Sequence, residues 1–225
     1  MKLKKILATG IAAVMILGTT VVGFADMGNG QWDSTSIYPK DVVNTQYFTP
    51  VKFLVDKKVV HGDENGLFNP SKNISRAEFA KMMAVMTNNT GQMSVLQKQN
   101  YFSDVPSDHW AKGYINCIKN SGLMQGTGNG QFTPSREVSY VEVIATMIRS
   151  RNASAVTTGT WPNNYITYAK AYLNPIVGDR NITDWNAPAT KGDVAMMMYR
   201  YYKKATPAPT TTGGGVTTGG GVGTP

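Results

Sequence analysis

Apolar residues recur at helical spacing after three similar start signals. The stripe that follows Ser75 contains Phe79, Met82, Met83 and Met86. Stripes of the same period follow Ser139 and Thr190. Residues three and four positions apart lie on one face of a helix, so each stripe predicts an amphipathic helix with one buried face. We assign the methionines and aromatic residues to a packed core rather than to a cofactor site.

A capping-box sequence precedes each of these helices. The three pairs, each a hydroxyl residue and an acid three positions later, are Ser75 and Glu78, Ser139 and Glu142, and Thr190 and Asp193. In such a pair the hydroxyl accepts a hydrogen bond from the amide of the acid, and the carboxylate accepts one from the amide of the hydroxyl residue. Capping explains these residues in full, and direct ligand binding is the alternative.

Two of the three segments are copies of each other over a longer stretch. At a constant offset, a glycine-containing loop is repeated, so that Gly62, Gly66, Phe68 and Pro70 match Gly126, Gly130, Phe132 and Pro134. A shorter apolar stripe that begins near Trp110 and ends at Gly122 predicts a further helix before this loop. A third, weaker copy has an eroded loop at 177–179 and ends in the helix after Thr190.

Each copy therefore predicts two helices joined by a loop, in too few residues to bury its own apolar face well. Three copies packed side by side could share one core. We expect an all-α fold built from three tandem helix-loop-helix units.

The two ends of the chain differ in composition from this repeated part. Residues 1–25 have the pattern of a secretory signal peptide: three lysines, the apolar run 6–22 and small residues at 23–25. A retained membrane anchor is the alternative. Residues 26–37 form a short lead. The segment 205–225 contains Thr, Pro and Gly without charged or aromatic residues, which predicts a flexible linker or disordered tail.

Composition narrows the chemistry that is possible. The 225 residues include one Cys and two His, too few for a disulfide framework or a zinc site, and we expect no metal and no cofactor. Asp63 and Asn65 suggest a calcium loop, but Ile74 stands where that loop needs a carboxylate, so we interpret the segment as a turn. The formal net charge is +8, of which the signal peptide carries three, and a basic protein suits an anionic polymer.

The motifs resemble those of S-layer homology (SLH) modules. The second copy carries the opening of the family pattern, Phe102-Ser-Asp104-Val105 followed by Trp110, and the first carries its closing motif, Ile74-Ser75-Arg76-Ala77-Glu78-Phe79. The resemblance places three modules at 38–92, 98–156 and 160–204, the third divergent. It implies that the modules pack as a pseudo-threefold bundle. It also implies that grooves between modules bind secondary cell-wall polysaccharide, often through a pyruvate ketal on a terminal sugar.

The resemblance also implies which residues bind the polysaccharide. They are Arg76, Trp110, Lys191, Ser75, Gly62 and Gly126. The arginine of the closing motif is Arg76 in the first module, but Tyr140 and Lys191 occupy its place in the other two, so we expect one strong groove and weaker ones. A solvated surface position is the alternative for Arg76, and a core position is the alternative for Trp110. Since a cation at a helix start opposes the helix dipole, we expect Arg76→Ala to leave stability unchanged or slightly higher.

The sequence thus predicts a non-enzymatic protein that anchors itself non-covalently to a bacterial cell wall through an anionic polysaccharide. We expect it to be secreted to the cell surface, with no nucleic acid partner and no membrane association after signal cleavage. A self-assembling surface-layer protein is the main alternative. An exported wall hydrolase is weaker, because the carboxylates that a glycosidase needs are assigned here to helix caps and no nucleophile–base motif is present.

Overall fold

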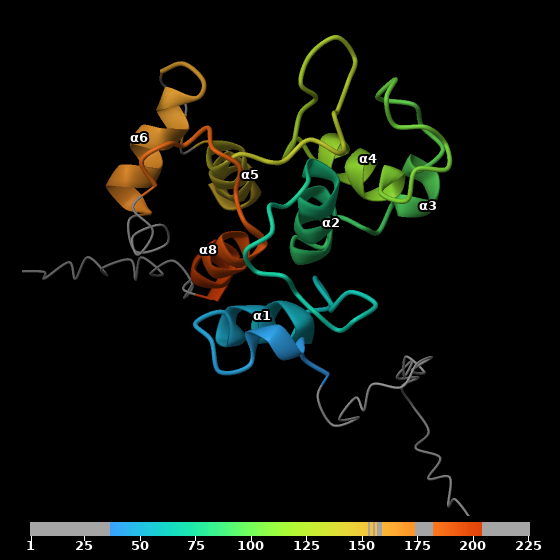
Figure 1. Ribbon diagram of the computed structural model, residues 1–225. Helices are drawn as coiled ribbons and strands as arrows, with labels where there is room; N and C mark the ends of the chain where they lie inside the picture. Colours follow the sequence, from blue (N-terminus) through green and yellow to red (C-terminus); the bar gives the residue numbers. More distant parts are fainter. Residues whose placement is uncertain (1–36, 153, 155, 157–158, 174–181, 204–225) are drawn as a thin grey trace, which may run out of the picture. The chain divides into compact units, whose positions relative to one another are not determined.

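The computed structural model describes residues 37–152, 154, 156, 159–173 and 182–203 (Figure 1). The predicted signal peptide at 1–25, nearly all of the lead at 26–37, the third loop at 177–179 and the tail at 205–225 lie outside these residues. The helices, in chain order, are η1 (Lys40–Val42), α1 (Phe48–Asp56), α2 (Arg76–Met86), α3 (Met93–Leu96), α4 (Lys112–Asn120), α5 (Tyr140–Asn152), α6 (Asn163–Tyr172) and α8 (Lys191–Lys203).

This part of the chain is helical, as expected. Extended pairing among the described residues is limited to isolated bridges, such as Asn73 with Thr190 and Ser139 with Pro188. None of the helices that the structure describes is long and apolar enough to cross a membrane.

The three long helices begin at the predicted caps. At α2 the box is complete: the Ser75 hydroxyl accepts from the amide of Glu78 at 3.2 Å, and the Glu78 carboxylate accepts from the amide of Ser75 at 2.8 Å. At α5 the Glu142 carboxylate accepts from the amide of Ser139 at 3.0 Å. At α8 the amide of Asp193 donates to the Thr190 hydroxyl at 3.1 Å.

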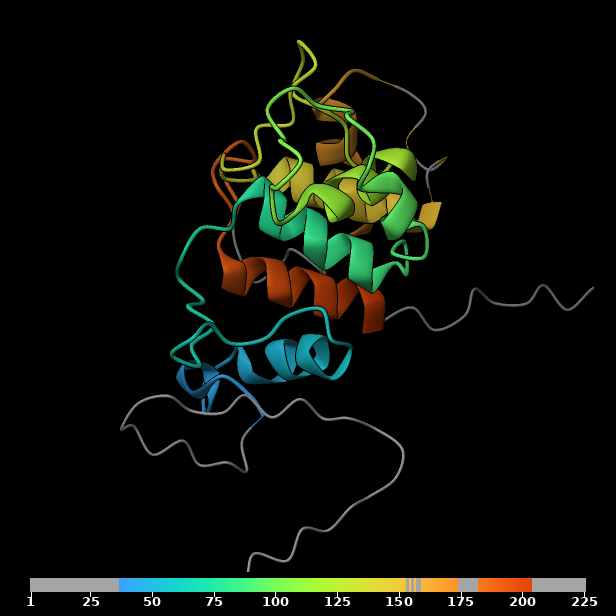
Figure 2. The ribbon, with the colours of Figure 1, turned by 90° about the vertical axis from the view of Figure 1, so that its right-hand side faces the viewer.

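A closed ring of backbone hydrogen bonds joins the residues just before these caps. The amide of Val138 donates to the carbonyl of Ile74 at 2.9 Å, the amide of Ala189 donates to Val138 at 2.9 Å, and the amide of Ile74 donates to Ala189 at 3.1 Å. The three starts of α2, α5 and α8 therefore meet at one point, and α5 contacts both α2 and α8 (Figures 1 and 2).

The first amides of each long helix are also taken by a neighbouring segment. Arg76 and Ala77 donate to carbonyls of the segment before α5, Tyr140 and Val141 to the segment before α8, and Lys191 and Gly192 to the segment before α2, at 2.8–3.2 Å. Helix starts normally leave such donors open for anions. Here the donors are used inside the fold.

Each long helix packs on a short helix from a different repeat. Helix α2 contacts α4, α5 contacts α6, and α8 contacts α1 (Figure 1). The last long helix thus covers the first short one. The helices of one sequence repeat do not form a unit with each other, so the core runs across the boundaries between repeats.

The loop motif has a structural cause that is the same in the first two copies. The carboxylate of Asp41 accepts from the amides of Phe68 and Asn69 at 2.8 and 2.7 Å, and Asp104 accepts from those of Phe132 and Thr133 at the same distances. This contact fixes the loop so that its phenylalanine is buried, at 5% exposure for Phe68 and none for Phe132.

The methionine and aromatic stripes lie in the core, as predicted. Phe79, Met83, Met147 and Met198 are fully buried. The segment suspected of calcium binding is a turn in which the Asp63 carboxylate accepts from the amides of Asn65 and Leu67, each at 2.9 Å.

Candidate functional site

Arg76, the strongest candidate from the sequence, is buried, with 3% of its surface exposed. Its Nε donates to the carbonyl of Phe132 at 2.8 Å and its Nη2 to the carbonyl of Gln125 at 2.9 Å. Its Nη1 lies 2.6 Å from the Glu142 carboxylate, and the guanidinium stands 4.5 Å from the centre of the Phe132 ring. A solvated surface position is therefore wrong for Arg76. The side chain joins the start of α2 to the second loop and to α5.

Glu142 receives a second guanidinium. Arg136, which is 45% exposed, donates to the same carboxylate oxygen at 2.7 Å, while the other oxygen accepts from the amide of Ser139. Burial alone raises the pKa of Glu142, but the hydrogen bonds from Arg136 and Ser139 and the charge of Arg76 hold that pKa below its usual value. Burial lowers the pKa of Arg76, and the charge of Glu142 opposes this shift. The guanidinium stays charged, because arginine is not deprotonated in proteins.

These groups line a cavity of about 520 Å³, here called the arginine cavity. Its lining residues are Arg76, Met124, Gln125, Gly126, Thr127, Arg136, Glu142, Thr146, Arg149 and Trp161. They come from the start of α2, the second loop, α5 and the segment before α6. Three guanidinium groups face one carboxylate, so the lining carries an excess of two positive charges. Such a lining suits a negatively charged ligand.

Arg149 and Trp161 form one wall of the arginine cavity. The guanidinium of Arg149 donates to the hydroxyl of Tyr165 at 3.0 Å and to the carbonyl of Leu123 at 3.3 Å. It lies 4.8 Å from the centre of the Tyr165 ring and 5.7 Å from that of Trp161, which is 50% exposed. Among the described contacts its Nη2 keeps open donors. A planar fork held in this way can donate to a carboxylate or phosphate.

Trp110 lies in a second cavity, of about 310 Å³, here called the tryptophan cavity. Its lining residues are Lys72, Asn73, Ser75, Ala77, Glu78, His109, Trp110, Pro134, Ser135 and Glu137. Trp110 is 58% exposed, so a core position is wrong for this residue. The two cavities have no lining residue in common, and the structure therefore does not bring Arg76 and Trp110 to one site.

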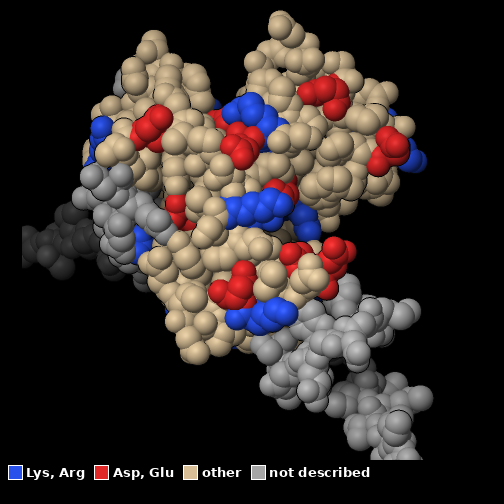
Figure 3. All heavy atoms as spheres, in the orientation of Figure 1, with Lys and Arg blue, Asp and Glu red and all other residues tan. Residues whose placement is uncertain are grey.

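The positions that match Arg76 in the other repeats hold equivalent contacts. Nζ of Lys191 lies 2.9 Å from the Glu78 carboxylate, and the Tyr140 hydroxyl donates to the carboxylate of Asp193. Burial raises the pKa of Glu78, but the amide of Ser75 and the ammonium of Lys191 bring it below its usual value. In all three places the residue after the cap contacts the capping acid of the next long helix. On the face in Figure 3, basic and acidic side chains lie next to one another in the centre.

The two candidate glycines stand where a side chain has no room. A Cβ at Gly62 would lie 2.9 Å from the Cα of Gly66, and one at Gly126 would lie 2.5 Å from the carbonyl oxygen of Gln131. Gly126 lines the arginine cavity, whereas Gly62 lines neither of the two cavities. Close packing within the loop accounts for both glycines, and their part in binding stays a prediction.

Among the lining residues that sequence reasoning missed are the two arginines and the tryptophan that give the arginine cavity most of its charge and its aromatic wall: Arg136, Arg149 and Trp161. One signal was present for Arg149, which follows Glu142 by two helical turns and so lies on the same face of α5. Another was present for Trp161, which precedes α6 much as Trp110 precedes α4. Arg136 lies in a loop, where helical periodicity gives no information.

Comparison with known proteins identifies two of the sequence repeats. The family model described as "S-layer homology domain" matches residues 40–80 and 101–144. These two segments are therefore similar to the S-layer homology domain. The segment 160–204, which includes α6 and α8, has no such match, so its standing as a third module stays a prediction.

The names of similar proteins refer to the cell wall or the cell surface. The "Middle cell wall protein" of Brevibacillus brevis is 28% identical over 87% of this chain, and the "Cell surface protein" of Thermoanaerobacter kivui is 28% identical over 88%. A "cell wall amidase" of Bacillus anthracis, whose name marks it as uncharacterized, is 28% identical over 48%. The chain spans only 18%, 24% and 20% of these three proteins.

Proposed function

We propose that this chain attaches non-covalently to the wall of a bacterial cell by binding an anionic secondary cell-wall polysaccharide. The observation that carries the proposal is the excess of positive charge in the arginine cavity, next to an exposed tryptophan. The ring of Trp161 offers an apolar face to a sugar, and the guanidinium groups beside it suit an acidic substituent such as a pyruvate ketal.

We assign the anion to Arg136 and Arg149 as its direct donors. The guanidinium of Arg76 already donates to two carbonyls and a carboxylate, so we assign Arg76 a structural role in the wall of the cavity. Arg136 is half exposed and Arg149 keeps open donors. A ligand that reaches both groups would bridge the second loop and α5, and Trp161 of the segment before α6 lies in the same cavity.

We further infer that α6 and α8 belong to a third, divergent module and that the three modules form a pseudo-threefold bundle. The closed ring of backbone bonds and the repeated contact between helix start and capping acid support this inference. The alignment with the Brevibacillus brevis protein supports it too, since an alignment over 87% of the chain must extend into the segment after residue 160.

The relatives favour attachment over a catalytic activity. This segment recurs as a small part of longer proteins whose names differ, a wall protein, a surface protein and an amidase. All three names refer to the cell wall or the cell surface, so the shared segment is better suited to hold such proteins at the wall than to perform the chemistry of one of them.

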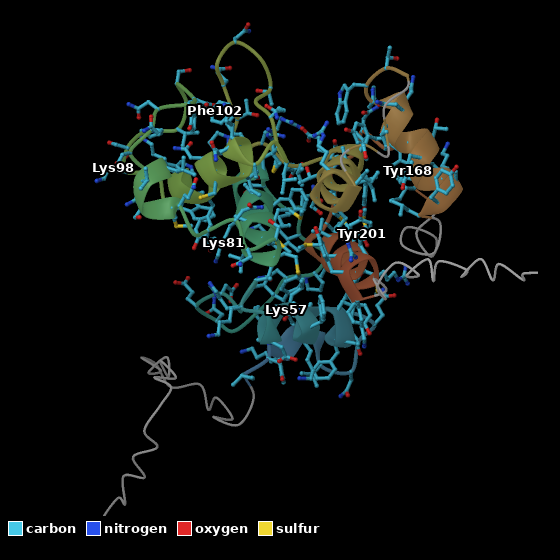
Figure 4. The ribbon with its side chains drawn as sticks, turned by 180° about the vertical axis from the view of Figure 1, so that it is seen from behind. Lys57, Lys81, Lys98, Phe102, Tyr168 and Tyr201 are labelled. Atoms are coloured by element: carbon cyan, nitrogen blue, oxygen red, sulfur yellow. The ribbon has the colours of Figure 1, made fainter. Side chains whose placement is uncertain are left out.

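The proposal is tested by sedimentation with purified cell-wall sacculi, before and after chemical removal of the secondary polysaccharide. We expect the chain to bind intact sacculi and to lose binding once the polysaccharide is removed. Arg149→Ala should weaken binding about 10- to 100-fold, because a hydrogen bond to a charged group contributes about 1.5–3 kcal/mol. Lys98→Ala is the matched control: it removes one positive charge from a residue that lines neither cavity and lies far from Tyr168 of α6 (Figure 4).

Two results would contradict the proposal. Binding that survives removal of the polysaccharide would place the ligand elsewhere in the wall. Ordered sheets that form in the absence of wall material would favour the self-assembling alternative.

A further inference from the structure

Tyr165 lies behind the arginine cavity and contacts two of the residues that form its wall. It stands in the first turn of α6 and is buried, with 8% of its surface exposed, and it is not among the residues that line the cavity. Its hydroxyl accepts a hydrogen bond from Nε of Arg149 at 3.0 Å. The centre of its ring lies 4.8 Å from that guanidinium and 5.6 Å from the centre of the Trp161 ring. One buried side chain thus joins Arg149 to Trp161.

The packing of α6 on α5 fixes the position of Tyr165. Tyr165 and Ala169 are the buried residues of α6, and they lie one helical turn apart on the face of the helix that packs against α5 (Figure 1). The hydroxyl of a buried tyrosine usually finds a hydrogen-bond partner, and here that partner is Arg149. Core packing therefore determines where this hydroxyl lies, and the hydroxyl in turn determines where Nε of Arg149 lies.

The two acceptors that hold Arg149 are both uncharged. Its Nε donates to the hydroxyl of Tyr165, and its Nη1 donates to the carbonyl of Leu123 at 3.3 Å. Arg76 and Arg136, in contrast, share the carboxylate of Glu142. An arginine side chain loses rotamer freedom when a ligand orders it, and this loss reduces affinity. Neutral acceptors order the guanidinium of Arg149 in advance and leave its charge for a ligand.

The first repeat has the tyrosine of this pair but not the arginine. Tyr114 follows Trp110 by four residues, as Tyr165 follows Trp161. The place of the arginine, two helical turns after the capping acid, is taken in α2 by Val85, whose side chain has no donor. Tyr114 therefore offers a matched control, because it has the same place in its repeat without an arginine to hold.

We propose that Tyr165 is a positioning residue of the arginine cavity: it holds the guanidinium of Arg149 so that the open N–H groups face an acidic group of the ligand. The inference rests on the proposed function, because that function assigns the anion to Arg149. It adds that affinity depends on a buried hydroxyl that does not itself contact the ligand.

Calorimetric titration of the full chain with purified secondary polysaccharide tests this role by a double-mutant cycle. Tyr165→Phe removes the hydroxyl and keeps the ring. We expect it to weaken binding about 3- to 10-fold, the range expected when a ligand has to order one long side chain. In a chain that already carries Arg149→Ala, the same substitution should have no further effect on affinity. Tyr114→Phe is the control and should bind like the unaltered chain.

A measurement without ligand reports on the same contact. In the ¹⁵N-labelled chain the Nε–H signal of Arg149 is assigned by its absence from Arg149→Ala. We expect this group to exchange slowly with water in the unaltered chain and in Tyr114→Phe, and rapidly in Tyr165→Phe, because the hydroxyl of Tyr165 protects it. Thermal melting verifies that each variant is folded.

The inference is overturned if Tyr165→Phe binds like the unaltered chain although Arg149→Ala binds more weakly, or if the two substitutions weaken binding additively. It is also overturned if the Nε–H group of Arg149 exchanges equally fast with and without the hydroxyl of Tyr165. Failure of the proposed function has a different signature: Arg149→Ala then binds the polysaccharide like the unaltered chain, even where the Nε–H group is protected as expected.

Discussion

At the scale of single residues, Arg76 shows what burial adds to a sequence motif. The sequence identifies an arginine at a helix start, where its charge opposes the helix dipole. The structure surrounds it with Glu142 and two carbonyls in a buried position. These partners lie 49–66 residues away along the chain. No local pattern could reveal them, and the expectation that removal of Arg76 leaves stability unchanged does not take them into account.

We therefore predict that Arg76→Ala destabilises the fold strongly. Removing one partner of a buried ion pair typically costs about 3–5 kcal/mol, because the remaining charge and the carbonyls lose their partner. Arg136→Ala removes a half-exposed arginine from the same carboxylate and should cost about 1 kcal/mol or less. Urea unfolding of the two variants measures the difference. Equal stability of the two variants would contradict the structural role of Arg76.

A second prediction concerns the pH dependence of stability and follows from the lowered pKa of Glu142. A carboxyl whose pKa is lower in the folded state stabilises the fold above the unfolded pKa of about 4.3, and this contribution is lost as the pH falls through the folded value. Glu142→Gln should be less stable at neutral pH, and its stability should fall less steeply on acidification below about pH 4.3 than that of the unaltered chain. Thermal melting across this range measures both effects. Parallel curves would mean that Glu142 does not contribute to the pH dependence.

At the scale of elements, helix starts were easier to predict than helix partners. The three capping sequences locate α2, α5 and α8, because a cap is a local arrangement within four residues. The apolar stripe shows that one face is buried, but it does not show against which helix. Pairing α8 with α1 depends on contacts between the two ends of the fold, and the sequence repeats suggest instead that each repeat pairs its own helices.

The packing of α8 against α1 explains why a glycine stands at position 192. It stands where the other repeats have Ala77 and Val141, and a Cβ there would lie 2.6 Å from the Tyr47 ring and 2.9 Å from the carbonyl oxygen of Pro70. We predict that Gly192→Ala destabilises the fold by about 1–3 kcal/mol through overpacking between the start of α8 and the segment before α1.

Gly91→Ala is the matched control, because a Cβ at Gly91 meets no atom within 4 Å. Urea unfolding compares the two variants. A Gly192→Ala chain that is as stable as the Gly91→Ala chain would mean that Tyr47 does not pack against α8 as described.

At the scale of the whole molecule, the core is shared across the repeats. A chain that ends before Trp161 lacks α6, which packs on α5, and α8, which packs on α1. We predict that this truncation melts at a lower temperature and less cooperatively than the full chain, because it exposes apolar surface on both remaining partners. Scanning calorimetry provides the measurement. A truncated chain that melts at the temperature of the full chain would refute the shared core.

The charge in the arginine cavity is the basis of the proposed attachment, and calorimetric titration tests it most directly. The purified secondary polysaccharide is compared with the same material after its carboxyl groups have been reduced to alcohols. If the arginine cavity holds an acidic residue, the native polymer binds and the reduced polymer binds at least about 10-fold more weakly, as expected for the loss of one charge-assisted contact. Equal affinity for the two polymers would contradict the account.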